Sequence, residues 1–251
     1  MSMIVEGVSY AYPKNPVLKD VSFEIGKGEC VAILGTNGVG KSTLLKCLNN
    51  VINAQAGAIT VADMPLNGMS GDELARLIGY VPQNSFFPDI TVFDAVLLGR
   101  KPYIKWDITK DDLEIAENMI KSLSLEKFAL RKVNYMSGGE MQKVAIARAL
   151  AQQPTILLFD EPTSNLDLKN QLEVIQIIKD IVQKQQISAI VTMHDLNLAL
   201  RFADKFMMMK DGRIHAMGGA EIITPQNIWE VYGVQVSIEN YNGYHIVIPQ
   251  Q

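Results

Sequence analysis

The stretch of residues 136–167 constrains the fold more than any other part of this sequence. A helix start, a helix, a proline break, a short apolar run and an acidic pair follow one another there with almost no spare residues. Ser137-Gly138-Gly139-Glu140 has the S-x-x-E spacing of a capping box, which predicts that Ser137 caps a helix. Two glycines leave the N–H groups of that helix start uncovered, so this terminus can bind a phosphate.

A buried strand is predicted directly after this helix. Residues 155–159 are an apolar run of the kind found inside parallel sheets. The run delivers Asp160 and Glu161 at its carboxyl end.

A phosphate-binding loop stands upstream. Gly35-Thr36-Asn37-Gly38-Val39-Gly40-Lys41-Ser42 is a complete G-x-x-x-x-G-K-S motif. A strand-like run, 30–34, precedes the motif, and a helix-like run, 43–48, follows it. This strand–loop–helix context favours a true phosphate loop over a chance match in a glycine-bearing turn.

Composition and charge exclude several classes of protein. The 251 residues can form one large domain or two lobes. No apolar stretch approaches the roughly 20 residues of a membrane-spanning helix, and the first ten residues are too polar for a secretory signal. The net charge of −4 gives no basic field for nucleic acid. Cys30 and Cys47 lack metal or redox spacing, so we expect small buried side chains in a reducing cytoplasm.

The hydrophobic pattern divides the chain into regions of one α/β domain that covers residues 1–251. Residues up to about 83 are mostly strand-like, with Val21, Phe23 and Ile25 alternating with polar residues. Residues 84–153 have helical periodicity, including an apolar stripe of Leu113, Ala116, Ile120 and Leu123. Strands and helices alternate from 154 to about 220. We therefore predict a core of residues 1–83 and 154–220, an inserted helical subdomain of residues 84–153 and a C-terminal extension of residues 221–251.

The motif residues suggest nucleotide hydrolysis. Lys41 is placed to reach the β- and γ-phosphates, while Thr43 helps to hold the α-phosphate. Ser42 and Asp160 are the candidate anchors for Mg²⁺, although an aspartate at a strand end could instead cap a turn. Glu161 is the candidate general base for the attacking water.

Together these motifs closely resemble those of the ATP-binding subunits of ABC transporters. The resemblance covers nearly the whole chain and implies a P-loop NTPase (RecA-like) core with a mixed sheet, an antiparallel β region and an inserted α-helical subdomain. It also implies ATP and Mg²⁺ as ligands. In this resemblance His194 matches the switch histidine that contacts the γ-phosphate, and Gln83 matches the glutamine that reaches metal and water. Tyr12 matches the aromatic that stacks on adenine, although strand alternation alone would allow Tyr10 as well.

The resemblance further implies a homodimer with shared sites. The glycine-containing helix start (Ser137, Gly138, Gly139 and Glu140) would close on the γ-phosphate held by the other copy. Asp167 would lie at the seam between the two copies. Met136 and Glu140 depart from the usual leucine and glutamine of this motif, but each preserves size or hydrogen-bonding reach.

Softer stretches resemble the importer ATPases for iron-siderophore, haem and cobalamin. They are Leu98-Gly99-Arg100, Pro102-Tyr103, His194-Asp195-Leu196-Asn197-Leu198-Ala199 and the tail around Val231-Tyr232-Gly233-Val234. This branch implies two permease subunits, an external solute-binding protein and a peripheral position on the cytoplasmic side of the membrane. Phe86, Phe87 and Pro88 could line a groove for a permease helix or pack the helical core.

Three alternatives remain open from the sequence. A soluble ABC ATPase without a transport role usually carries extra arms, duplicated cassettes or cluster cysteines. An exporter subunit would share every catalytic residue. A purely binding cassette conflicts with the intact Lys41, Asp160, Glu161 and His194. The transported substrate is not encoded in this chain.

Overall fold

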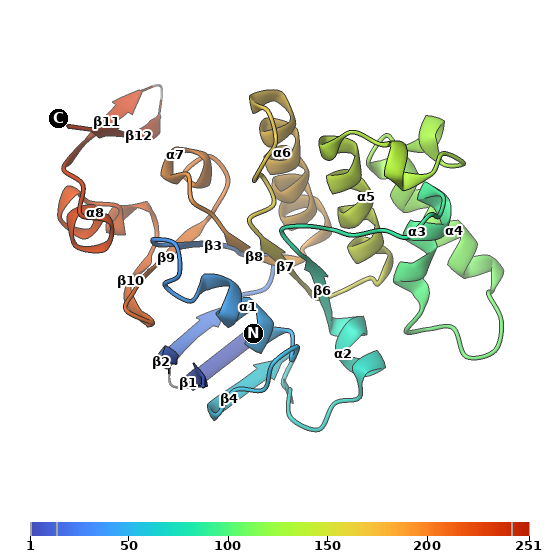
Figure 1. Ribbon diagram of the computed structural model, residues 1–251, viewed down its shortest axis with the longest axis horizontal. Coiled ribbons are helices and arrows are strands. Elements are labelled where there is room, and N and C mark those ends of the chain that lie inside the picture. Colours follow the sequence, from blue (N-terminus) through green and yellow to red (C-terminus); the bar gives the residue numbers. More distant parts are fainter. Residues whose placement is uncertain (1, 14, 242, 251) are drawn as a thin grey trace.

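The computed structural model describes residues 2–13, 15–241 and 243–250 (Figure 1). Its central sheet has the strand order β10-β9-β3-β8-β7-β6. Five of these strands are parallel, and β10 runs antiparallel at one edge. The mixed sheet predicted from the sequence is therefore confirmed. The strands are β3 (Cys30–Leu34), β6 (Ile78–Val81), β7 (Ile156–Asp160), β8 (Ser188–Thr192), β9 (Lys205–Lys210) and β10 (Arg213–Gly218).

A second sheet forms the antiparallel region, with the strand order β2-β1-β4-β5. It consists of β1 (Met3–Tyr12), β2 (Asn15–Ile25), β4 (Ala56–Val61) and β5 (Met64–Pro65). Val21, Phe23 and Ile25 are buried as the alternation predicts, and the polar residues between them are exposed. The turn predicted after Tyr12 includes Lys14, which lies outside the described residues.

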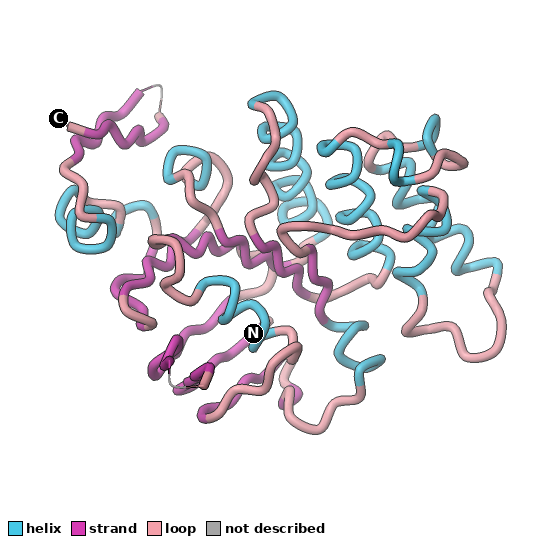
Figure 2. Tube along the Cα trace, in the orientation of Figure 1, coloured by secondary structure: helices cyan, strands magenta, loops and turns pink. Residues whose placement is uncertain are grey.

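Two hydrophobic cores lie on opposite faces of the central sheet. Along β3, Cys30, Ala32 and Leu34 belong to one core, while Val31 and Ile33 belong to the other. Strands buried on both faces read as continuous apolar runs, which explains the unbroken hydrophobicity of these segments. Helices cover the first face, and α1 with the antiparallel sheet covers the second (Figure 2).

The helices outside the segment between β6 and β7 are α1 (Lys41–Leu48), α2 (Gly71–Leu77), α6 (Leu168–Gln185), α7 (Leu196–Ala199) and α8 (Pro225–Tyr232). The segment between β6 and β7 holds α3 (Val92–Leu97), α4 (Lys110–Ser122) and α5 (Gly138–Ala151), with single 3₁₀ turns η1 (Leu98–Arg100), η2 (Glu126–Phe128) and η3 (Val133–Tyr135). A further turn, η4 (Ala220–Ile222), precedes α8, and the chain ends in the hairpin β11 (Val236–Tyr241) and β12 (Tyr244–Pro249). None of the helices within the described residues is both long and apolar enough to cross a membrane.

The predicted apolar stripe of α4 is partly wrong. Ala116, Ile120 and Leu123 are buried, but Leu113 is 37% exposed. The buried position in that turn is Asp112, which pairs with Arg100 at 2.9 Å. A buried ion pair thus sets the rotation of the first turn of α4, and a purely hydrophobic pattern could not reveal it.

Two smaller predictions have clear outcomes. Cys30 and Cys47 are free and buried, as expected. Phe87 packs in the helical core, whereas Phe86 is 88% exposed and Pro88 is exposed as well. Packing in the helical core is therefore confirmed for Phe87, and the groove for a permease helix stays a prediction.

Candidate site for ATP binding and hydrolysis

Four neighbouring strands end at the same edge of the central sheet, and each delivers one part of the site. The phosphate loop follows β3, Gln83 comes two residues after β6, Asp160 ends β7, and His194 comes two residues after β8. The parallel pairing of these strands brings together segments that are far apart in the sequence. They border a cleft with a volume of about 460 Å³. Its lining consists of Tyr12, Asn15, Val17, Asn37, Gly38, Gly40, Lys41, Ser42, Thr43, Gln83, Glu161 and His194.

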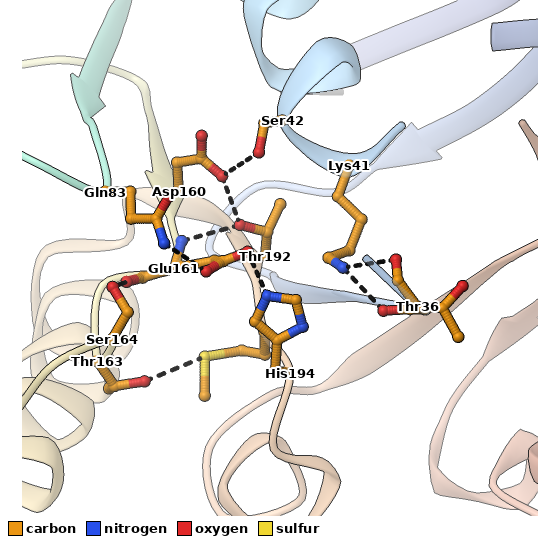
Figure 3. A network of polar contacts seen from close by, with 12 residues as sticks. Thr36, Lys41, Ser42, Gln83, Asp160, Glu161, Thr163, Ser164, Thr192 and His194 are labelled. Carbon is orange, nitrogen blue, oxygen red and sulfur yellow. Dashed lines mark hydrogen bonds and ion pairs between the residues drawn. The ribbon is translucent and has the colours of Figure 1, made fainter. Parts of the chain in front are cut away.

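The phosphate loop is shaped around the amine of Lys41. Its Nζ donates hydrogen bonds to the carbonyl oxygens of Gly35 (2.7 Å) and Thr36 (3.1 Å), as Figure 3 shows. Burial lowers the pKa of Lys41, and the carboxylates of Glu161 and Asp160 oppose that shift. Gly35 has a φ of +147°, and a Cβ there would lie 2.7 Å from the carbonyl oxygen of Met209. Only glycine allows this turn, so the loop geometry is fixed by the sequence.

Ser42 and Asp160 meet across the cleft, as the sequence predicts for a metal-binding pair. The Ser42 hydroxyl donates to Asp160 Oδ1 at 2.8 Å, and Thr192 Oγ1 donates to the same oxygen at 2.9 Å (Figure 3). Tyr80 reaches the other carboxylate oxygen at 3.4 Å. Burial, followed by the charge of Asp160, raises the pKa of Tyr80 to about 12. The Tyr80 hydroxyl therefore stays protonated and remains a donor.

The oxygen chemistry of this pair suits Mg²⁺. Mg²⁺ prefers oxygen ligands, keeps several waters and is usually held by one or two protein groups together with substrate phosphates. Within the described residues no cluster of three or more His, Cys, Asp or Glu side chains could hold a metal without such help. Ser42 and Asp160 beside the phosphate loop fit a metal that arrives with a nucleotide.

Glu161 occupies the centre of the polar network. Its carboxylate accepts a hydrogen bond from Gln83 Nε2 at 2.7 Å and contacts His194 Nε2 on the other oxygen (Figure 3). Its backbone N–H donates to Thr192 Oγ1 at 2.9 Å. Glu161 has a φ of +48°, an uncommon left-handed conformation for a residue with a side chain. Such a conformation persists where the surroundings enforce it, and here it turns the carboxylate toward the cleft.

The sequence did not predict a role for Thr192, whose side chain contacts both Asp160 and Glu161. Its hydroxyl donates to Asp160 and accepts from the backbone of Glu161. Thr192 is the last residue of β8 and is fully buried. A hydroxyl at the carboxyl end of a strand with an apolar centre, two residues before His194, was the available signal.

Tyr12 and Tyr10 lie in different surroundings. Their rings meet edge to face, with centroids 5.0 Å apart. Tyr12 lines the cleft, whereas Tyr10 packs against the core beneath the antiparallel sheet. The position of Tyr12 is therefore the one compatible with a base stacked at the cleft mouth.

The glycine-containing helix start does not line this cleft, although Gly138 and Gln83 line a neighbouring pocket. Ser137 caps α5, and its capping box with Glu140 is complete, with the Glu140 carboxylate accepting from the Ser137 N–H at 2.9 Å. Gly139 packs so closely on Asn170 that a Cβ would lie 2.4 Å from its side-chain oxygen. Asn170 in turn donates to the carboxylate of Asp167, which caps α6. Asp167 and the helix start thus form one surface unit that the sequence did not predict, separate from the cleft of the same chain.

Comparison with known proteins gives a consistent assignment. Residues 18–164 match the ABC transporter family. An uncharacterised ABC transporter ATP-binding protein of Methanocaldococcus jannaschii is 55% identical over 249 residues, covering 99% of this chain and 98% of the relative. A hemin import ATP-binding protein of Thermobifida fusca is 37% identical over 247 residues, covering 96% of this chain and 86% of the relative.

Two solved structures show the same architecture. An ABC transporter in an inward-facing conformation, provisionally assigned to the metal-chelate type, has a TM-score of 0.86 at 29% identity and covers 100% of this chain and 98% of its own. A dimeric ATP-binding cassette in a post-hydrolysis state with ADP and Pi has a TM-score of 0.77 at 32% identity, covering 86% of this chain and 98% of its own. The chain therefore belongs to the ABC transporter family. Within that family it is the ATP-binding subunit, an ATPase that drives transport.

Proposed function

We propose that this chain energises an importer for iron-siderophore, haem, cobalamin or a related metal-containing solute. Support comes from relatives that match nearly its whole length. Besides the hemin import protein, a probable siderophore transport system ATP-binding protein of Bacillus subtilis is 34% identical and covers 97% of this chain and 91% of the relative. The likeness extends through the C-terminal extension, beyond the residues that match the ABC transporter family.

Nucleotide binding starts from the phosphate loop. Backbone N–H groups of residues 35–43 would surround the phosphates, and Lys41 would exchange the carbonyls of Gly35 and Thr36 for the β- and γ-phosphate oxygens. A phosphate is a stronger acceptor for an ammonium group than a neutral carbonyl. Thr43 would hold the α-phosphate, and Tyr12 would stack on the adenine.

Ser42 and Asp160 would hold Mg²⁺, with Gln83 completing the set. When bound, the metal would neutralise the charge that develops on the phosphate oxygens. The chain itself contributes the placement of Asp160, whose carboxylate is oriented by Ser42, Thr192 and Tyr80 before any ligand arrives.

The position of Glu161 is the single observation that carries the hydrolysis mechanism. Its carboxylate lies at the cleft between Gln83 and His194, with a side chain only 14% exposed. We assign Glu161 as the general base that orients the attacking water and accepts its proton. His194 would contact the γ-phosphate, and Gln83 would orient both water and metal. Opening of the contacts that now satisfy Glu161 would admit the water.

A homodimer would complete each site. The helix start at Ser137, Gly138, Gly139 and Glu140 does not line the cleft of its own chain, so it is free to close on the γ-phosphate of a second copy. Asp167, linked to Gly139 through Asn170, would lie at the seam. The dimeric neighbour with ADP and Pi supports this arrangement.

The proposed partners follow from the transport role. Two permease subunits would hold the dimer at the cytoplasmic side of the membrane, and an external solute-binding protein would supply the substrate. A permease helix would dock near the Gln83 loop, where Phe86 and Pro88 are exposed. No nucleic acid takes part.

The first test is ATPase activity of the full chain against protein concentration, with Glu161→Gln examined for ATP-induced dimers by size-exclusion chromatography. We expect activity to rise faster than linearly and the variant to form a dimer with ATP. Linear activity without a dimer would contradict the shared site. Reconstitution with candidate permease subunits, in vesicles offered a ferric siderophore, haem or cobalamin, tests the direction of transport and the class of substrate. Export, or no transport of any of the three, would contradict the importer role.

A further inference from the structure

The C-terminal hairpin is attached to the helix that follows His194. The side chain of Asn197, on α7, forms two hydrogen bonds with the backbone of Val247, on β12. Asn197 Nδ2 donates to the Val247 carbonyl at 3.1 Å, and the Val247 N–H donates to Asn197 Oδ1 at 2.8 Å. The two residues are 50 positions apart. Figure 1 shows the hairpin beside α7, at the end of the molecule opposite the α3–α5 segment.

Apolar packing reinforces this attachment. Val247 is 5% exposed and Val236 is 7% exposed. Both belong to the same core as Leu198 and Ala199 of α7. The Asn197 amide satisfies one backbone N–H and one C=O at a partly buried site. Two such hydrogen bonds fix both the position and the direction of α7 relative to β12, so the hairpin holds α7 in place.

His194 depends on α7 for its own position. The helix begins two residues after His194, with Asp195 as its N-cap, and the Asp195 carboxylate accepts from the Leu198 N–H at 3.0 Å. The His194 side chain is 43% exposed, so little side-chain packing holds the ring. Apart from its contact with Glu161, the position of the ring therefore depends on the backbone on either side, which is β8 before it and α7 after it.

We propose that the C-terminal hairpin is a positioning element for hydrolysis, and that Asn197 is the positioning residue through which it fixes His194. The proposal rests on the role assigned to His194 above. It gives a function to a part of the chain that lies outside the residues matching the ABC transporter family. A neighbouring part of the same extension borders the phosphate loop, since Val231 of α8 lines a second cleft together with Thr36 and Val39.

The attachment can be broken from either side. Asn197→Ala removes both hydrogen bonds between the α7 side chain and the backbone of Val247. Val247→Pro removes the N–H that Asn197 accepts, and proline is tolerated on an edge strand where the N–H points away from the ladder. Asn227→Ala is the matched control. Asn227 lies in α8 and donates to the Ile222 carbonyl at 2.7 Å, so this variant also loses an amide-to-backbone bond of the extension but leaves α7 untouched.

We expect Asn197→Ala and Val247→Pro each to lower kcat for ATP about tenfold, less than the roughly 10²-fold that a full ångström of misplacement can cause. The KM for ATP should not change, because Lys41 and Tyr12 keep their positions. The double variant should lose no more than either single variant, since both break one attachment. Asn227→Ala should keep the kcat of the unmodified chain.

The outcomes separate this inference from the proposed function. If His194→Ala hydrolyses ATP normally, the role of His194 fails and the hairpin inference fails with it. If His194→Ala is inactive while Asn197→Ala keeps its kcat, only the role of the hairpin is withdrawn. Additive losses in the double variant, or an equal loss in Asn227→Ala, would mean general destabilisation and would likewise overturn it.

Discussion

Gln83 donates a hydrogen bond of 2.7 Å to the carboxylate of Glu161, although 78 positions and the whole α3–α5 segment separate the two residues. The pairing of β6 with β7 makes this contact, because Val81 stands opposite Phe159 in the register and Gln83 and Glu161 each lie two positions after their member of that pair. The loop after β6 also leads to the exposed Phe86. A movement of this loop at Phe86 would therefore reach Glu161 through the side chain of Gln83.

Glu161→Gln should lower ATP turnover by about 10²–10⁴-fold, the usual contribution of a general base. ATP affinity should stay close to that of the unmodified chain, because the phosphate loop is unchanged. Single-turnover hydrolysis and nucleotide binding by fluorescence measure the two effects. Glu117→Gln, on the exposed face of α4, is the control. Wild-type turnover in Glu161→Gln would remove the general-base assignment.

Removing Asp112 should destabilise the helical segment. Arg100 pairs with Asp112 at 2.9 Å, and both residues are at most 5% exposed. Asp112→Ala leaves a buried guanidinium uncompensated, which costs about 3–5 kcal/mol. Denaturant unfolding monitors the loss, and Asp111→Ala, on the exposed neighbour, should change stability little. Equal stability of the two variants would contradict a structural role for the pair.

The same pair predicts a pH dependence. Burial raises the pKa of Asp112, but hydrogen bonds from Thr109 and Arg100 outweigh it, so the pKa lies below its ordinary value of 3.8. A carboxyl with a depressed native pKa stabilises the fold above its unfolded pKa and loses that contribution as pH falls through the native one. Stability should therefore decline below about pH 4. Asp112→Ala should show a smaller acid dependence, which urea unfolding at several pH values can test.

Gly139→Ala should destabilise the fold, whereas Gly138→Ala should not. A Cβ at Gly138 would meet Leu166 at an ordinary 3.7 Å, so Gly138→Ala should be neutral or stabilise the helix by up to about 1 kcal/mol. A Cβ at Gly139 would lie 2.4 Å from the side-chain oxygen of Asn170, which Asp167 holds in place. Overpacking there should cost about 1–3 kcal/mol. Thermal unfolding that ranks the two variants in the reverse order would contradict the packing of α5 on α6.

Neither cysteine should react in the folded chain. Burial raises the pKa of both thiols, that of Cys47 to about 11, and the thiolate is the reactive form. A thiol-specific chromogenic reagent at pH 8 should label no cysteine in the native state and two after unfolding. Rapid labelling of the native chain would show that β3 or α1 opens easily.

The sequence predicted the parts of the site that local rules determine. The phosphate loop, the cap at Ser137 and the strands before Asp160 and His194 each have a local pattern, and each is found where expected. The contacts of Thr192 with Asp160 and of Asn170 with Gly139 join distant segments, so no local pattern could indicate them. Helix α2 was not predicted, because its seven residues lie within a stretch that is mostly strand-like, although Ser70 and Glu73 form a capping box there.

The register between β6 and β7 also determines where related chains can differ in loop length without changing the site. The two strands are joined by direct pairing, not by the segment that runs between them along the sequence. Residues can be added to or removed from the loops among α3, α4 and α5 without changing the distance from Gln83 to Glu161. Insertions there would remodel the outer surface of the α3–α5 segment and would leave the hydrolytic chemistry as it is.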